Sequence, residues 1–180
     1  MIANASSEII VRGSLTTGAT FSACGQYRYL LWRYWKIDGE CNPILMVGLN
    51  PSKADETHND PTIRRCIQFA KDWGFDGLLM ANVFAYMATQ PKQLFKVPDP
   101  IGSDNDRILT QSVKQAKKVV VAWGNHCPRD RQDAIAKLID KPLYCLGLNK
   151  NGSPKHPLYL AKTTQLRRYS PLVLSGIIEI

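Results

Sequence analysis

Four short stretches of the chain consist almost entirely of apolar residues, and three stretches between them repeat apolar residues every three or four positions. The apolar stretches are residues 43–49, 77–83, 118–123 and 142–146. The periodic stretches are residues 62–73, 104–117 and 129–139. Continuous apolar runs predict strands buried on both faces, and the longer period predicts amphipathic helices. Their alternation predicts an α/β protein, a three-layer α/β/α sandwich around a mainly four-stranded parallel sheet.

Residues 20–37 precede this alternating region and are rich in aromatic residues, with Gly25 inside the stretch. They predict an N-terminal hairpin or paired edge strands. The first predicted helix has recognisable end signals. Asp60 is suited to the N-cap, Pro61 to the first helical position, and Gly74 to the position just beyond the end.

Length and composition favour one globular domain covering residues 1–180. The chain is 44% apolar and 21% charged, which excludes disordered and fibrous classes. No apolar run is long enough to span a bilayer, and the first residues lack the pattern of a secretory signal. We therefore expect a cytosolic protein without membrane contact.

The five cysteines form no CxxC pair and are widely and irregularly spaced. This spacing is typical of reduced cysteines in a cytosolic protein and not of a disulfide framework or a zinc site. With only three scattered histidines, the sequence predicts no metal site, and we expect no cofactor.

The charge is unevenly distributed. The chain has 23 basic and 15 acidic side chains, a net charge of +8, but residues 1–60 carry a slight negative excess. Between residues 141 and 178 there are six bases and no acid. Such an excess attracts a nucleic acid or a nucleotide phosphate, although a solvated basic face would give the same pattern.

Ligands of parallel sheets bind outside the carboxyl ends of the strands, so the residues that follow each strand are the first candidates. Gly48, Asn50, Pro51 and Ser52 follow the first apolar stretch, before Asp60. Asn50 can hold a water or a polar ligand edge, and Asp60 lies at a helix N-terminus that offers amides to an anion. A simple turn and a simple N-cap explain the same residues.

The later strand ends are similar in character. Asn82 closes the second apolar stretch, and its amide suits the edge of a nucleobase, although a turn asparagine bonded to its own backbone is equally compatible. Phe84 and Tyr86 could stack on a base or pack in the core. His156, framed by prolines after the fourth stretch, could stabilise a leaving anion or be structural.

The ordered motifs GLNPS, NDPTIRR, AN before an aromatic residue, SDND, AWG and GSPKHPLYL resemble the bacterial and phage family known as domain of unknown function 1643, over residues 20–169. More distantly, the set is similar to the uracil-DNA glycosylase superfamily. That resemblance implies that Asn50 positions an attacking water, Asn82 reads the base, and His156 steadies charge at the base carbonyl. It also implies that Leu158 and Tyr159 form a wedge in the DNA stack.

The chain departs from the glycosylase superfamily in two places. The loop 50–62 contains no aromatic residue to stack under a base, and the final loop reads HPLYL instead of HPSPLS. NDPTIRR and SDND belong to the narrower family and suggest extra contacts, for example to a phosphate or a sugar.

We therefore expect a glycosylase-like enzyme that hydrolyses an N-glycosidic bond of a nucleobase, modified or unmodified, in DNA or a nucleotide. The alternatives are a non-catalytic nucleotide- or nucleic-acid-binding module, such as a phage defence or counter-defence factor, and a purely structural role. The expected catalytic residues are Asn50, Asp60 and His156. The expected substrate-binding residues are Gly48, Pro51, Ser52, Arg64, Asn82, Phe84, Tyr86, Trp123, Gly124 and Ser153. The expected nucleic-acid-binding residues are Lys150, Lys155, Leu158, Tyr159, Arg167 and Arg168.

Overall fold

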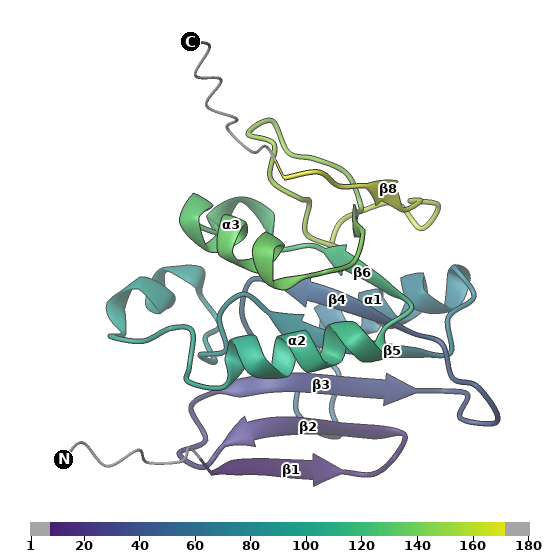
Figure 1. The fold of residues 1–180 in the computed structure, drawn as a ribbon, viewed down its shortest axis with the longest axis horizontal. Coiled ribbons are helices and arrows are strands. Elements are labelled where there is room, and N and C mark those ends of the chain that lie inside the picture. The colour runs from purple at the N-terminus through teal and green to yellow at the C-terminus, as the bar shows by residue number, and fades with distance from the viewer. Residues whose placement is uncertain (1–7, 172–180) are drawn as a thin grey trace.

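The computed structural model describes residues 8–171 and contains, within them, one mixed sheet of eight strands in the order β1-β2-β3-β5-β4-β6-β7-β8 (Figure 1). The strands are β1 (Ile9–Gly13), β2 (Thr17–Ser22), β3 (Arg28–Tyr34), β4 (Pro43–Gly48), β5 (Gly77–Asn82), β6 (Lys118–Val121), β7 (Leu143–Cys145) and β8 (Arg167–Arg168). The helices are α1 (Pro61–Asp72), α2 (Asn105–Gln115) and α3 (Arg129–Leu138), with the 3-10 helices η1 (Pro91–Lys96) and η2 (Gly124–His126).

The four apolar stretches form β4, β5, β6 and β7, which pair in parallel at the centre of the sheet. The α/β class is therefore confirmed, but the sheet is larger than the expected four strands. β1, β2 and β3 add three antiparallel strands on one side, and β8 pairs antiparallel with β7 on the other. The β2–β3 pair is the expected hairpin. β1 is largely exposed and β8 has only two residues, so neither leaves a clear apolar pattern.

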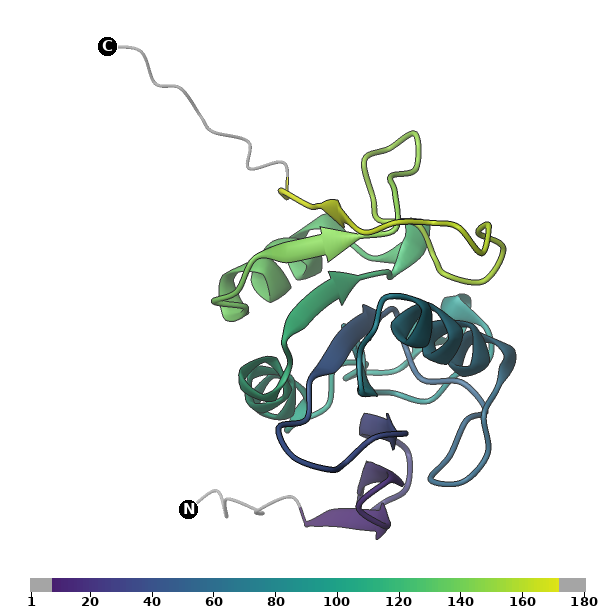
Figure 2. The same ribbon diagram turned by 90° about the vertical axis from the view of Figure 1, so that its right-hand side faces the viewer.

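Alternate residues of the central strands contact helices on opposite faces of the sheet. Leu45 and Val47 of β4 belong to one apolar cluster, with residues of α2 and α3. Ile44 and Met46 belong to another, with residues of α1. Figure 2 shows the sheet between α1 on one side and α2 and α3 on the other. This two-sided burial explains why the strands are apolar throughout.

The ends of α1 follow the predicted signals. The Asp60 side chain accepts a hydrogen bond of 2.8 Å from the backbone N–H of Ile63, and Pro61 is the first helical residue. Gly74 follows the helix with φ of +77°, a conformation that favours glycine. The helix begins and ends within one residue of the predicted range, and Asp60 is thereby fixed beside the end of β4.

All five cysteines are free, and Cys66, Cys127 and Cys145 are buried. None of the helices within residues 8–171 is long and apolar enough to cross a membrane.

Candidate functional site

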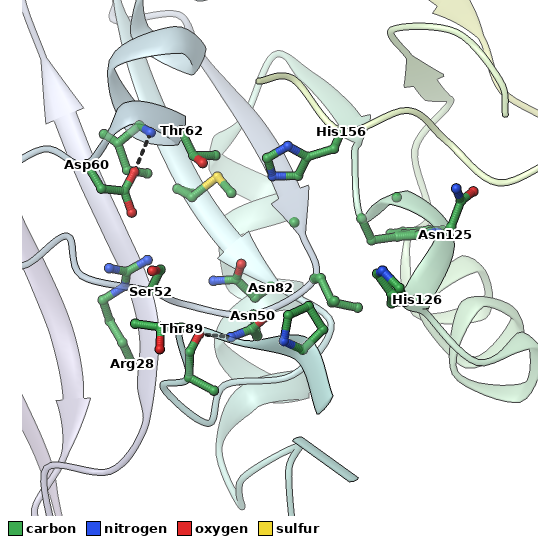
Figure 3. A pocket seen from close by; sticks show the side chains of 18 of the residues that line it. Arg28, Asn50, Ser52, Asp60, Thr62, Asn82, Thr89, Asn125, His126 and His156 are labelled. Atoms are coloured by element: carbon green, nitrogen blue, oxygen red, sulfur yellow. Dashed lines mark hydrogen bonds between the residues drawn. The ribbon is translucent and has the colours of Figure 1, made fainter. Parts of the chain in front are cut away.

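A cavity of about 440 Å³ lies at the carboxyl ends of β4, β5 and β6 (Figure 3). Parallel strands end at the same edge of a sheet, so this position is the expected one for a ligand. Eight of the predicted site residues line the cavity, namely Gly48, Asn50, Ser52, Asp60, Asn82, Trp123, Gly124 and His156. The structure thus gathers the three predicted catalytic residues around one space.

Asn82 is the most unusual residue of the cavity. Its side chain is only 1% exposed, and neither Nδ2 nor Oδ1 has a hydrogen-bond partner among the described residues. In Figure 3 this amide points into the middle of the cavity. Leaving buried polar atoms unpaired costs roughly 1–3 kcal/mol each. A ligand with one donor and one acceptor in the right places would recover that cost.

The backbone at Asn82 is held rigidly from the α2 and α3 side. The buried Asn105 donates from Nδ2 to the carbonyl oxygens of Asn82 and Val83, at 3.0 and 3.3 Å. The buried Arg131 donates from Nε to the Val83 carbonyl at 2.8 Å and forms an ion pair with Asp106. Two residues of the SDND motif, Asn105 and Asp106, therefore support the strand end that carries Asn82.

Gly48 is required because of its neighbours. A Cβ atom at this position would lie 2.9 Å from Oδ1 of Asn82 and 2.7 Å from Cε of Met80. We expect Gly48→Ala to displace the Asn82 amide, to weaken ligand binding about tenfold and to cost about 1–3 kcal/mol of stability through overpacking. Isothermal titration calorimetry and denaturant unfolding would measure the two effects. Unchanged binding in the folded variant would contradict this role.

Asn50 faces the same space from the end of β4. Its Nδ2 donates to the carbonyl oxygens of Pro51, at 2.9 Å, and Ala88, at 2.6 Å. These two bonds fix the orientation of the amide, so that its oxygen is left as an acceptor. Among the described residues, Oδ1 of Asn50 receives no hydrogen bond.

Asp60 contributes a carboxylate at the opposite wall, next to Thr62. One carboxylate oxygen caps α1 through Ile63, and the side chain is half-buried at the cavity. The loop that leads to Asp60 is fixed by Arg33, which donates from Nε to Oδ1 of Asn59 at 2.8 Å and from Nη2 to the Asp55 carbonyl at 2.6 Å. In the NDP sequence, Asn59 therefore holds the loop in place through Arg33, and Asp60 faces the cavity.

Arg28 is a buried cation in the cavity wall. Its side chain is 2% exposed, and its hydrogen bond within the described residues runs from Nη1 to the carbonyl of Ala54. Burial lowers the pKa of Arg28 to about 10, and the charge of Asp60 opposes this effect. The guanidinium therefore remains charged at neutral pH, with Nε unpaired.

His156 lies across the cavity from Arg28 (Figure 3). Desolvation lowers the pKa of His156 from its usual value, and the negative charge of Asp60 opposes the shift. The backbone N–H of Leu158 donates to Nδ1 at 3.3 Å, so a neutral ring carries its proton on Nε2. His156 is thus arranged as a neutral hydrogen-bond donor.

Trp123 and Gly124 join the end of β6 to the final loop. Trp123 is buried, and its Nε1 has no partner among the described residues. Gly124 has φ of +72° and donates from its N–H to the carbonyl of Pro154 at 3.0 Å. This bond brings the loop with His156 over the end of the sheet.

A family described as "Protein of unknown function (DUF1643)" matches residues 28–158. The chain belongs to the DUF1643 family. No curated protein and no solved structure matches it. The matched range contains every residue that lines the cavity, from Arg28 to His156. The cavity is therefore built entirely from the part of the chain that defines DUF1643.

Three predicted substrate-binding residues of this DUF1643 protein lie outside the cavity lining. Phe84 is in the core and packs edge-to-face on Phe95. Tyr86 packs edge-to-face on Tyr27, where a short bridge joins the two backbones. Pro51 is buried, and its carbonyl accepts from the N–H of Ala88. The two aromatic rings therefore pack against other aromatic rings, and Pro51 is held in its loop, in contacts that the sequence did not predict.

Arg64 and Ser153 also lie outside the cavity. Ser153 is buried in the final loop, where its hydroxyl donates to Oδ1 of Asn125 at 2.7 Å. Arg64 is exposed on α1 and borders a separate shallow groove together with Leu158 and Tyr159. Tyr159 is 97% exposed, so the predicted wedge is accessible at the surface beside the cavity.

The predicted basic residues of the last segment are spread over the surface. Lys150 is exposed in the final loop, and Lys155 is half-buried in the same loop. Arg167 and Arg168 are exposed on β8, and the guanidinium of Arg168 lies 5.8 Å from the centre of the Tyr144 ring. None of these four side chains lines the cavity.

Several cavity residues were missed by the sequence reasoning. These are Arg28, Leu49, Thr62, Ile63, Met80, Ala88, Thr89, Pro91, Asn125, His126 and Asn149. Asn125 and His126 directly follow the third apolar stretch, so their position was an available signal. Arg28 lies inside the predicted hairpin of residues 20–37, and no pattern indicates that it reaches a cavity. Within residues 8–171, no group of three or more histidine, cysteine or acidic residues could hold a metal ion.

Proposed function

We propose that this protein recognises a nucleobase and hydrolyses its N-glycosidic bond, in DNA or in a nucleotide. The observation that carries the proposal is the buried, unpaired amide of Asn82 in a cavity that also holds Asn50, Asp60 and His156. A carboxamide offers one donor and one acceptor side by side, which matches the hydrogen-bonding edge of a base.

Asn50 and Asp60, which line the same cavity, fit the chemistry of water attack. Oδ1 of Asn50 is held as a free acceptor, and Asp60 adds a carboxylate at the same cavity. Together they would orient a water toward C1′ of the sugar as the bond to the base breaks and positive charge develops on the ring. The water oxygen becomes bonded to C1′, and its proton passes to Asp60.

His156 is suited to the departing base. Its neutral ring would donate a hydrogen bond to an oxygen of the base, which leaves with the electron pair of the broken bond. A neutral donor stabilises negative charge as it develops without protonating the base in advance.

The fold supports the comparison with uracil-DNA glycosylases at a coarse level. A parallel core with helices on both faces, and a site at its carboxyl edge, are the features that a three-layer glycosylase-like sandwich requires. The exposed Tyr159 and the half-buried Leu158, beside Arg64, are a suitable surface for a wedge that would hold DNA open after base flipping. We further propose a cytosolic location, where free cysteines persist.

The decisive experiment is a mass-spectrometric screen for bases released from modified and unmodified DNA and from nucleotides. The wild-type protein should release at least one base, and Asn50→Ala should reduce the rate by about 100-fold or more, within the range of a lost catalytic group. Asn50→Ala should retain binding, because Asn82 carries recognition. Binding without release in the wild-type protein would instead indicate the non-catalytic nucleotide-binding module.

A further inference from the structure

Arg28 is a buried charge in the cavity wall that contacts no counter-ion. The side chain is 2% exposed, and although the charges of Asp60 and Asp55 act on it, none of the described residues lies within 4 Å as an ion-pair partner. Its hydrogen bond to the Ala54 carbonyl uses Nη1 and leaves Nε unpaired. A buried cation without a counter-ion in direct contact is costly, so it is retained where something else pairs with it.

The surroundings of Arg28 supply further donors. Ser52 lies beside the guanidinium, and Thr89 lies on the same side of the cavity (Figure 3). Both side chains are exposed, and neither hydroxyl takes part in a hydrogen bond within residues 8–171. A guanidinium that shares a cavity wall with two free hydroxyls is a typical environment for a carboxylate or a phosphate.

Arg33 is a second buried arginine, and it differs from Arg28 in having a purely structural role. It is also buried on β3, but its guanidinium is saturated by Asn59, Asp55, Gly18, Trp32 and His58, and it does not line the cavity. Arg33 has a complete structural role in holding the loop. Arg28 performs only one such contact.

We propose that the ligand of this cavity carries an anionic group, which binds to Arg28, Ser52 and Thr89 while its base edge binds to Asn82. The inference rests on the proposed function, because it takes a nucleobase as the group on Asn82. Two sources would supply the anion. It is either an acidic substituent on the base or the phosphate of a free nucleotide.

The test is isothermal titration calorimetry with three probes: pyrimidine nucleosides, their 5′-monophosphates, and 5-carboxypyrimidine nucleosides. The wild-type protein should bind one anionic class about 10- to 100-fold more tightly than the neutral nucleosides, the range of a charge-assisted hydrogen bond. Preference for the monophosphate identifies a free nucleotide, and preference for the carboxylated nucleoside identifies a modified base. Equal affinity for neutral and anionic probes overturns the proposal.

Arg28→Gln should abolish the discrimination between anionic and neutral probes, whereas the matched control Arg33→Gln should preserve it. The ratio of affinities is informative even if both variants are less stable. Should Arg28→Gln fail to fold, the double variant Ser52→Ala, Thr89→Ala changes only exposed side chains and should reduce the discrimination about 3- to 10-fold. Undiminished discrimination in Arg28→Gln, or in the double variant, contradicts the assignment.

Mass spectrometry of the titrated ligand keeps the two proposals distinguishable. Anion-selective binding without base release leaves the Arg28 site intact and removes the hydrolase. Base release without anion selectivity supports the hydrolase and contradicts the anion site at Arg28.

Discussion

Replacing Asn82 with leucine should stabilise the protein and abolish recognition of its ligand. Leucine has the same number of non-hydrogen side-chain atoms as asparagine, and the Asn82 amide has no hydrogen-bond partner among the described residues to lose. Removal of these unpaired polar atoms from a site that is 1% exposed should raise the free energy of unfolding by about 1–2 kcal/mol. The melting temperature should then rise by about 2–6 °C.

The same variant should bind nucleosides and their monophosphates on the order of 100-fold more weakly, because the polar edge of the base would face an apolar side chain. Calorimetric titration and thermal unfolding measure the two effects.

Asn105→Leu is the matched control. Asn105 is equally buried, but its amide donates to two carbonyls, so this variant should lose stability. If Asn82→Leu is destabilised like Asn105→Leu, Asn82 has a structural role.

Asp60→Asn should reduce base release by about 10²- to 10⁴-fold, the usual contribution of a general base. Asparagine is as good an N-cap as aspartate, so the stability of α1 should change by only a few tenths of a kcal/mol. The substitution thus removes the carboxylate and keeps the cap on Ile63. Single-turnover rates on the substrate found in the release screen provide the measurement.

Asp60→Ala is the companion variant, because it removes both functions of the residue. It should match Asp60→Asn in rate and lose a further ~1 kcal/mol of stability through the missing cap. A normal rate in Asp60→Asn would show that Asp60 only caps α1. Water would then be positioned by Asn50 without a carboxylate.

The strand ends are the part of the site that the sequence predicts best. Asn50, Asp60, Asn82 and His156 were recognisable because each follows a buried apolar stretch or caps the helix after one. Sheet geometry then requires such residues to meet at one edge. Phe84 satisfied the same criterion of position, yet its side chain packs into the core. The position of a residue after a strand end therefore does not determine whether its side chain faces the cavity or the core.

Arg28 illustrates what the local pattern cannot show. It begins β3, a strand of the antiparallel side of the sheet that precedes the parallel core in the chain. Only the pairing of β3 with β5 brings it to the wall of the cavity formed by β4, β5 and β6. Likewise, nothing local in SDND indicates that Asn105 holds the carbonyl of Asn82.

The sequence by itself determined the α/β class, the parallel core, the end signals of α1 and the strand ends that contribute to the cavity. These features depend on periodicity and on local backbone preferences, which act over a few residues. The tertiary structure decided the eight-stranded mixed sheet, the unpaired state of Asn82 and the position of Arg28 in the cavity. These depend on contacts between residues distant in the chain, so only the folded arrangement specifies which polar groups are satisfied and which face the cavity.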